Sequence, residues 1–129
     1  MEFLYELTVL PDFLYQVDNG VDFMKMNGVK ILLEAYKRYN PLSEEEIKSS
    51  NTTLNYRIIS AIMDAIGVAT QNNPNAIQYT HQSNLVSFII DELNNIYVNY
   101  KNNDIPIHGQ LINKLMFTLS SIVCHIYFL

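Results

Sequence analysis

Residues 54–93 constrain the fold most, because apolar side chains recur there at helical spacing in three successive segments. Residues 55–71 predict a long helix, since positions three, four and seven apart share one face. That face carries Ile58, Ile59, Ile62, Met63, Ile66 and Ala69. The sequence Asn72-Asn73-Pro74 ends this helix, because proline disfavours helical geometry in the residue before it.

Two further helices are expected after this stop. A short helix covers residues 74–82, and a third follows Ser83-Asn84, which can cap its first turn. The apolar stripe of the third helix is Leu85, Phe88, Ile89 and Leu93. Each helix has one apolar side, so the three-helix unit cannot bury its core alone and needs neighbours.

The same order of elements occurs twice. Residues 18–36 and 73–93 both give a turn, a short helix, a break and an amphipathic helix, and the long helix near Asn55 recurs near Gln110. In the first segment Asp18-Asn19-Gly20 is expected to form the turn or cap and Asn27-Gly28 the break, and Ile31 is expected among the inward positions of the helix that follows. The interval is about fifty-odd residues, longer than the roughly 40–47 of armadillo-type repeats. We therefore predict an all-α fold, an α-solenoid in which successive units stack.

Two long loops supply the excess length in this prediction. Loops are expected over residues 40–54, which contain Pro41, three consecutive glutamates and several Ser and Thr residues, and over residues 94–109, which are rich in Asn and broken by Pro106. Residues 1–129 then form one armadillo-like helical repeat domain of about two to three repeats, expected to be part of a longer chain.

Composition fits a packed protein and disfavours two classes of partner. Hydrophobic residues make up 49% of the chain and charged residues 16%, which is enough apolar surface for a core. Eight Lys and Arg residues against thirteen Asp and Glu residues, a net charge of −5, argue against nucleic acid. The apolar run at residues 115–124 is about half the roughly 20 residues that a membrane helix needs, so no membrane partner is expected.

The candidate catalytic residues do not form an arrangement that points to an enzyme. Adjacent helical residues such as Cys124 and His125 point about 100° apart, so a buried structural cysteine is the expected role. No metal site is expected, because the three histidines, His81, His108 and His125, lie on separate elements. The pairs Asp18 with Asp22 and Asp91 with Glu92 are expected at turns or exposed helix positions.

No cofactor is expected either. The four glycines stand singly, so the chain has no Gly-rich loop that could cradle a phosphate.

The polar faces of the two long helices are the candidate binding surface. The first carries Arg57, Ala61, Asp64, Val68 and Gln71, and the second carries Lys114, Phe117, Ser121 and Cys124. In a solenoid these ridges stack along one concave surface.

Residues 66–74, Ile-Gly-Val-Ala-Thr-Gln-Asn-Asn-Pro, resemble a run of the armadillo-repeat nucleotide exchange factors of seventy-kilodalton heat-shock chaperones. In that family an aliphatic residue and a glycine precede the end of a long helix at Gln-Asn-Asn-Pro. Residues 17–23, the helix start at Gly28-Val29, and residues 114–121 are similar to further family segments in the same order. The resemblance covers nearly the whole chain.

The resemblance implies a co-chaperone that performs no chemistry of its own. The concave face would clasp one lobe of the chaperone's nucleotide-binding domain and favour a splayed state that holds ADP poorly. The expected contacts are Arg57, Asp64, Val68, Gln71, Lys114, Phe117 and Ser121. Solvated helix surface is the alternative for the polar members, and core packing is the stronger alternative for Val68 and Phe117.

Other interpretations remain at this point. A generic armadillo-type scaffold would bind an extended peptide in its groove, and a helical interaction domain would dimerise through an exposed end. The absence of a basic leader and the single cysteine favour the cytoplasm. Asn51-Thr52-Thr53 is an N-glycosylation sequon, which admits the endoplasmic reticulum lumen as the alternative compartment.

Overall fold

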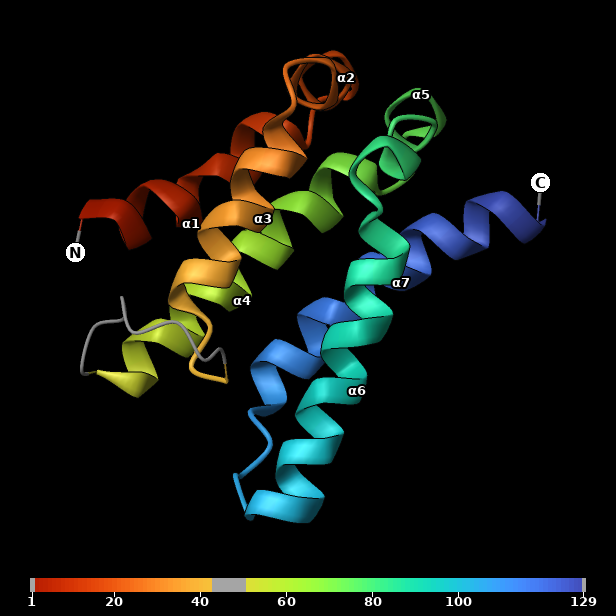
Figure 1. Ribbon diagram of the computed structural model, residues 1–129. Helices are drawn as coiled ribbons and strands as arrows, with labels where there is room; N and C mark the ends of the chain where they lie inside the picture. Colours follow the sequence, from red (N-terminus) through yellow and green to blue (C-terminus); the bar gives the residue numbers. More distant parts are fainter. Residues whose placement is uncertain (1, 43–50, 129) are drawn as a thin grey trace.

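A computed structural model describes residues 2–42 and 51–128 of the chain. Within these ranges the protein is all-helical and contains no strand (Figure 1). The α-helices are α1 (Glu2–Leu14), α2 (Val17–Lys25), α3 (Gly28–Tyr39), α4 (Thr52–Thr70), α5 (Pro74–Ile77), α6 (Leu85–Asn103) and α7 (Gly109–Phe128), with a 3-10 helix, η1 (Thr80–Ser83), between α5 and α6.

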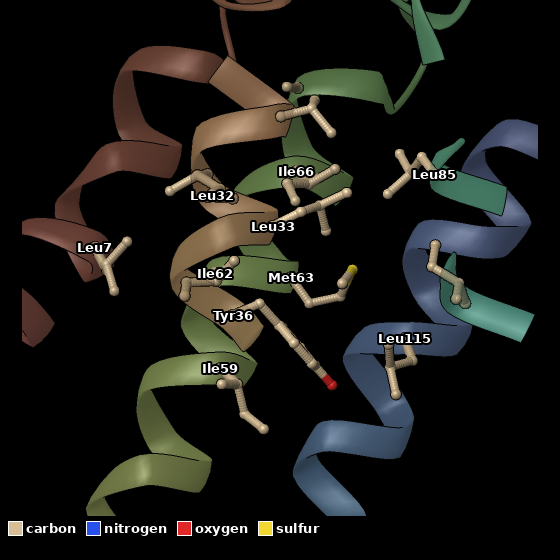
Figure 2. Close-up of a cluster of buried hydrophobic side chains, with 14 of the residues drawn as sticks. Leu7, Leu32, Leu33, Tyr36, Ile59, Ile62, Met63, Ile66, Leu85 and Leu115 are labelled. Carbon is tan, nitrogen blue, oxygen red and sulfur yellow. The ribbon is translucent and has the colours of Figure 1, made fainter. Parts of the chain in front are cut away.

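Helix α4 is the centre of the structure. It lies between α1 and α7, and α3 packs on it as well (Figure 1). The apolar stripe predicted for this helix is confirmed, because Ile58, Ile59, Ile62, Met63, Ile66 and Ala69 are all buried. Side chains from α1, α3, α6 and α7 converge on the same core, among them Leu7, Tyr36, Leu85 and Leu115 (Figure 2).

Asn residues that flank α4 determine where the helix begins and how the chain turns after it. The helix begins at Thr52, three residues earlier than predicted, because the Asn51 side chain accepts a hydrogen bond from the Leu54 amide at 3.0 Å. The predicted stop is confirmed: α4 ends at Thr70, and Asn72 adopts the left-handed conformation with φ 52°. Asn73 then caps α5, since its side-chain oxygen accepts from the Ala76 amide at 3.3 Å.

The loop predicted over residues 94–109 is wrong for most of its length. Helix α6 continues to Asn103, and only residues 104–108 connect it to α7. Ile96 is buried against the core, and Asn99 donates to the Asn95 carbonyl at 2.9 Å. An Asn-rich sequence can therefore stay helical when a packed apolar residue holds it in place. Of the loop predicted over residues 40–54, residues 52–54 belong to α4 and residues 43–50 lie outside the described ranges.

The turn predicted at Asp18-Asn19-Gly20 is also wrong, since α2 begins at Val17 and contains these residues. Gly20 is there for close packing. A Cβ atom on Gly20 would lie 2.9 Å from the Ala69 carbonyl oxygen and 2.7 Å from the Asn73 amide nitrogen. The break predicted at Asn27-Gly28 is confirmed, because Asn27 is left-handed with φ 60° and α3 starts at Gly28.

Elements that correspond in the two halves of the chain lie next to each other. Helices α1, α4 and α7 are adjacent in that order, and α2 packs against α5. Helices α3 and α6 meet where the rings of Tyr36 and Phe88 pack edge to face, with centroids 5.1 Å apart. Left-handed Asn27 and Asn84 occupy the same joint in each half, directly before α3 and before α6. Helix α1 passes through Pro11 without dividing into two.

Candidate functional site

Helices α4 and α7, which carry the predicted contact residues, pack side by side and run in the same general direction (Figure 1). Three polar contacts join them. Lys114 Nζ lies 3.0 Å from Asp64 Oδ1, and Thr118 Oγ1 donates to the Met63 carbonyl at 3.0 Å. The Thr70 and Ser121 hydroxyls are 2.9 Å apart. These contacts join residues 63–70 of α4 to residues 114–121 of α7.

A cavity of about 210 Å³ opens where α1, α4 and α7 meet, and we call it the seam cavity. It brings together three of the predicted contact residues, Arg57, Asp64 and Lys114. The other residues that line it are Leu4, Leu7 and Thr8 from α1, Ser60 and Ala61 from α4, and Gln110 from α7. The wall that α1 contributes was not predicted from the sequence.

The charges of the seam cavity do not balance. Lys114 and Asp64 form an ion pair whose side chains are 35% and 30% exposed, so the pair contributes about 1 kcal/mol or less to stability. Arg57 is exposed and makes no ion pair or hydrogen bond in the described part of the chain. The cavity thus presents two cationic side chains and one carboxylate.

Ser60 is a polar residue of the cavity that sequence reasoning missed. Its side chain is buried, and its hydroxyl has no hydrogen-bond partner within the described residues. A buried hydroxyl without a partner costs stability, so most proteins avoid one. The sequence signal was a hydroxyl residue within the mostly apolar run of residues 58–63.

The remaining predicted contact residues lie elsewhere. Val68 and Gln71 line a separate hollow of about 600 Å³ at the end of α4, together with Tyr15, Gln16, Val17 and Asn72. Phe117 packs its ring against Gly67, where an added Cβ would approach the ring to 2.6 Å. Ser121 bonds to Thr70 and also donates to the Thr118 carbonyl at 2.8 Å. Phe117 and Ser121 therefore serve the contact between α4 and α7.

A second polar cluster lies between α3 and α6 around Glu92. The sequence placed Glu92 at an exposed helix position, and the structure corrects this, because Glu92 is buried at 5% exposure. Asn40 Nδ2 donates to Glu92 Oε2 at 2.7 Å, and Asn95 Nδ2 donates to Oε1 at 3.3 Å. Burial, and then the negative charge of Glu92, raise the pKa of both Tyr36 and Tyr56.

His108, His81 and Cys124, which the sequence analysis considered for catalysis or metal binding, lie in three different surroundings. The ring of His108 stacks on Tyr56 with centroids 4.6 Å apart, and its Nδ1 accepts from the Leu111 amide at 3.4 Å. His81 is exposed on η1. Cys124 is exposed, so the expectation of a buried cysteine is wrong. Among the described residues, no three His, Cys, Asp or Glu side chains lie close enough to hold a metal ion.

Two further observations bear on the surroundings of the protein. Asn51 of the sequon is exposed at the start of α4. Within residues 2–42 and 51–128, no helix combines the length and the hydropathy needed to span a bilayer.

No protein-family model, no curated protein and no solved structure matches the chain.

Proposed function

We propose that the chain is an α-solenoid of armadillo-like three-helix units. The support is the adjacency of corresponding elements: α1, α4 and α7 lie in series, α2 packs against α5, and the rings of Tyr36 and Phe88 join α3 to α6. Left-handed Asn27 and Asn84 stand at the same joint of each unit. Stacking of equivalent helices is what distinguishes a repeat array from an ordinary bundle.

We further propose that the protein is a co-chaperone that binds the nucleotide-binding domain of a seventy-kilodalton heat-shock chaperone and promotes ADP release. The observation that carries this proposal is the seam cavity, because it collects Arg57, Asp64 and Lys114 on the side where the three long helices meet. A charged hollow between α1, α4 and α7 is a suitable docking point for a partner domain.

Two of the residues that carry the family resemblance, Gly67 and Asn73, also make contacts that hold the helices together. Gly67 lets α7 approach α4, and Asn73 donates to the Val17 carbonyl at 3.1 Å while it caps α5. These contacts join α2, α4, α5 and α7 around the end of α4. The residues of the resemblance thus hold together the helices that the proposed units would consist of.

The proposed mechanism needs no chemical step. Binding to one lobe of the chaperone domain favours the splayed conformation only to the extent that this conformation binds more tightly than the closed one. Shifting an equilibrium from 1:99 to 99:1 takes a difference of roughly 5.5 kcal/mol in binding free energy. ADP, which the splayed state holds poorly, then dissociates and ATP replaces it.

The test is stopped-flow release of a fluorescent ADP analogue from isolated nucleotide-binding domains, one cytosolic and one from the endoplasmic reticulum lumen. We expect the chain to accelerate release from one of them, and the responding domain would identify the compartment, for which we propose the cytoplasm with the lumen as alternative. The double variant R57E/K114E should lose the effect. Lys37 and Arg38, the chain's only other arginine, are both exposed on α3, so the double variant K37E/R38E, which changes the net charge by the same four units, is the matched control.

The outcomes separate the proposal from its competitor. Acceleration that survives the double variant would remove the seam cavity from the binding surface. No acceleration of either domain, together with binding of extended peptides, would replace the exchange function with that of a generic peptide-binding scaffold.

A further inference from the structure

The seam cavity is short of one negative charge and one hydrogen-bond acceptor. Arg57 offers a guanidinium that no carboxylate occupies within the described residues, and Lys114 reaches Asp64 from the opposite wall. Ser60 also lines the cavity, and its buried hydroxyl has no hydrogen-bond partner within the described residues. A cation, a second cation and an unused donor that converge on one hollow are complementary to an anion.

We propose that the seam cavity binds the side-chain carboxylate of an aspartate or glutamate on a partner protein, held by Arg57, Ser60 and Lys114. This inference deepens the proposed function, on which it rests for the identity of the partner. The carboxylate accepts from the guanidinium, and it also accepts from the hydroxyl of Ser60, which lines the cavity. Lys114 shares its charge between this ligand and Asp64.

The cavity favours a carboxylate over larger or more highly charged anions. Its volume of about 210 Å³ suits one side-chain head group, whereas sites for whole drug-sized ligands start at roughly 300 Å³. Asp64 already places one negative charge in the cavity, so a phosphate dianion meets stronger repulsion than a singly charged carboxylate. Leu4 and Leu7 supply an apolar wall for the methylene groups of the ligand.

The test uses the free chain and does not need a chaperone. The probe is N-acetyl-glutamate N-methylamide, and its neutral control is N-acetyl-glutamine N-methylamide, which has nearly the same shape. Titration followed by amide chemical shifts in NMR should show saturable binding in the millimolar range, with shifts centred on residues 57–64 and 110–114. The glutamine probe should bind at least about tenfold more weakly, the ratio that a charge-assisted hydrogen bond commands.

Three substitutions in the cavity test the proposal, two of which should weaken binding and one of which should strengthen it. Arg57→Gln should weaken binding of the glutamate probe about tenfold, while Arg38→Gln leaves it unchanged. Ser60→Ala should weaken binding several-fold, although it removes an unpartnered hydroxyl and so does not lower the midpoint of thermal unfolding. Asp64→Asn should strengthen binding, because it frees Lys114 for the ligand. An ion pair that served only the fold would not give this increase.

Other outcomes overturn the proposal or separate it from the proposed function. Equal binding of the glutamine probe would show that charge does not matter in the cavity, and tighter binding of inorganic phosphate would assign it to phosphate. An equal loss in Arg38→Gln would reveal general electrostatics. If the glutamate probe binds as expected and no chaperone domain releases ADP faster, the cavity stands and the proposed function fails; if release is accelerated and the probe does not bind, the function stands and the cavity assignment fails.

Discussion

Asn40 donates a hydrogen bond from Nδ2 to Oε2 of Glu92 at 2.7 Å, and both side chains are buried. The bond joins the residue that follows α3 to the middle of α6, 52 positions later in the chain. No Lys, Arg or His forms an ion pair with Glu92 in the part of the chain that the structure describes. The amides of Asn40 and Asn95 therefore carry the compensation for this buried carboxylate.

Replacing Asn40 by Ala should destabilise the protein by about 1.5–3 kcal/mol, the range for a hydrogen bond to a charged group. The measurement is urea unfolding at neutral pH. Asn94→Ala, on the exposed side of the same helix as Glu92, is the control and should change the free energy of unfolding by no more than about 0.5 kcal/mol. Equal effects would mean that the buried bond contributes little.

The free energy of unfolding should fall as the solution becomes alkaline. Burial and Glu92 raise the pKa of Tyr36 and Tyr56 in the folded protein, so folded tyrosine keeps its proton after the unfolded chain has lost it. The stability that depends on these protons is fully present below the unfolded pKa of about 10, and it declines above that pH by up to about 1.4 kcal/mol per pH unit for each tyrosine.

Urea unfolding at several pH values between 9 and 11 checks this expectation. Tyr36→Phe should flatten the decline, because phenylalanine has no proton to lose. Tyr97→Phe, at an exposed position of α6, is the control for loss of a tyrosine hydroxyl as such. A decline of the same steepness in Tyr36→Phe would assign the alkaline loss to other groups.

Gly67→Ala should destabilise the protein by about 1–3 kcal/mol, although alanine normally favours a helix interior. The added methyl group would lie 2.6 Å from the Phe117 ring and from the Thr118 hydroxyl, so α7 must move away from α4. Gly109→Ala is the matched control, because a Cβ atom there meets nothing within 4 Å. Thermal unfolding of both variants distinguishes packing from propensity, and a second change, Phe117→Leu, should recover part of the loss in Gly67→Ala.

Asn73→Ala should cost about 1–3 kcal/mol, because the side chain makes a cap and two donor bonds at once. It accepts from the Ala76 amide, and it donates to the carbonyls of Val17 and Ala69. Asn75→Ala, two residues later and exposed, should be close to neutral. Denaturant midpoints for the two variants provide the comparison. Matching midpoints would show that the joint between α2, α4 and α5 is held by packing alone.

Local patterns predicted the helices that have strong periodicity and clear ends. The stripe of α4, its stop before Pro74 and the break at Asn27 follow from spacing and from residues that favour left-handed backbone. The length of α6 could not be predicted in this way. Its Asn-rich half is held in the helix by burial of Ile96 and by hydrogen bonds from the Asn99 side-chain amide to Asn95, one turn earlier.

Burial of polar residues depends on neighbours that are distant in sequence, so it escaped prediction. Glu92 is buried because Asn40 reaches it, and Ile31, expected to face inward, is 61% exposed because α3 presents Leu32, Leu33 and Tyr36 to α4 instead. The ridge spacing did select Arg57, Asp64 and Lys114, which share the seam cavity. The α1 wall and Ser60 were missed, because nothing in the order of residues says which earlier helix closes that hollow.

The position of α4 has a consequence for how the molecule comes apart. Helices that precede it and helices that follow it use the same rod as their wall, so neither half of the chain owns a complete interior. Cutting the chain between Gln71 and Asn72 would leave α4 in the first fragment, and the second fragment, α5 to α7, would lose the helix against which α7 packs. Heat or denaturant should therefore unfold both halves in one cooperative, two-state transition.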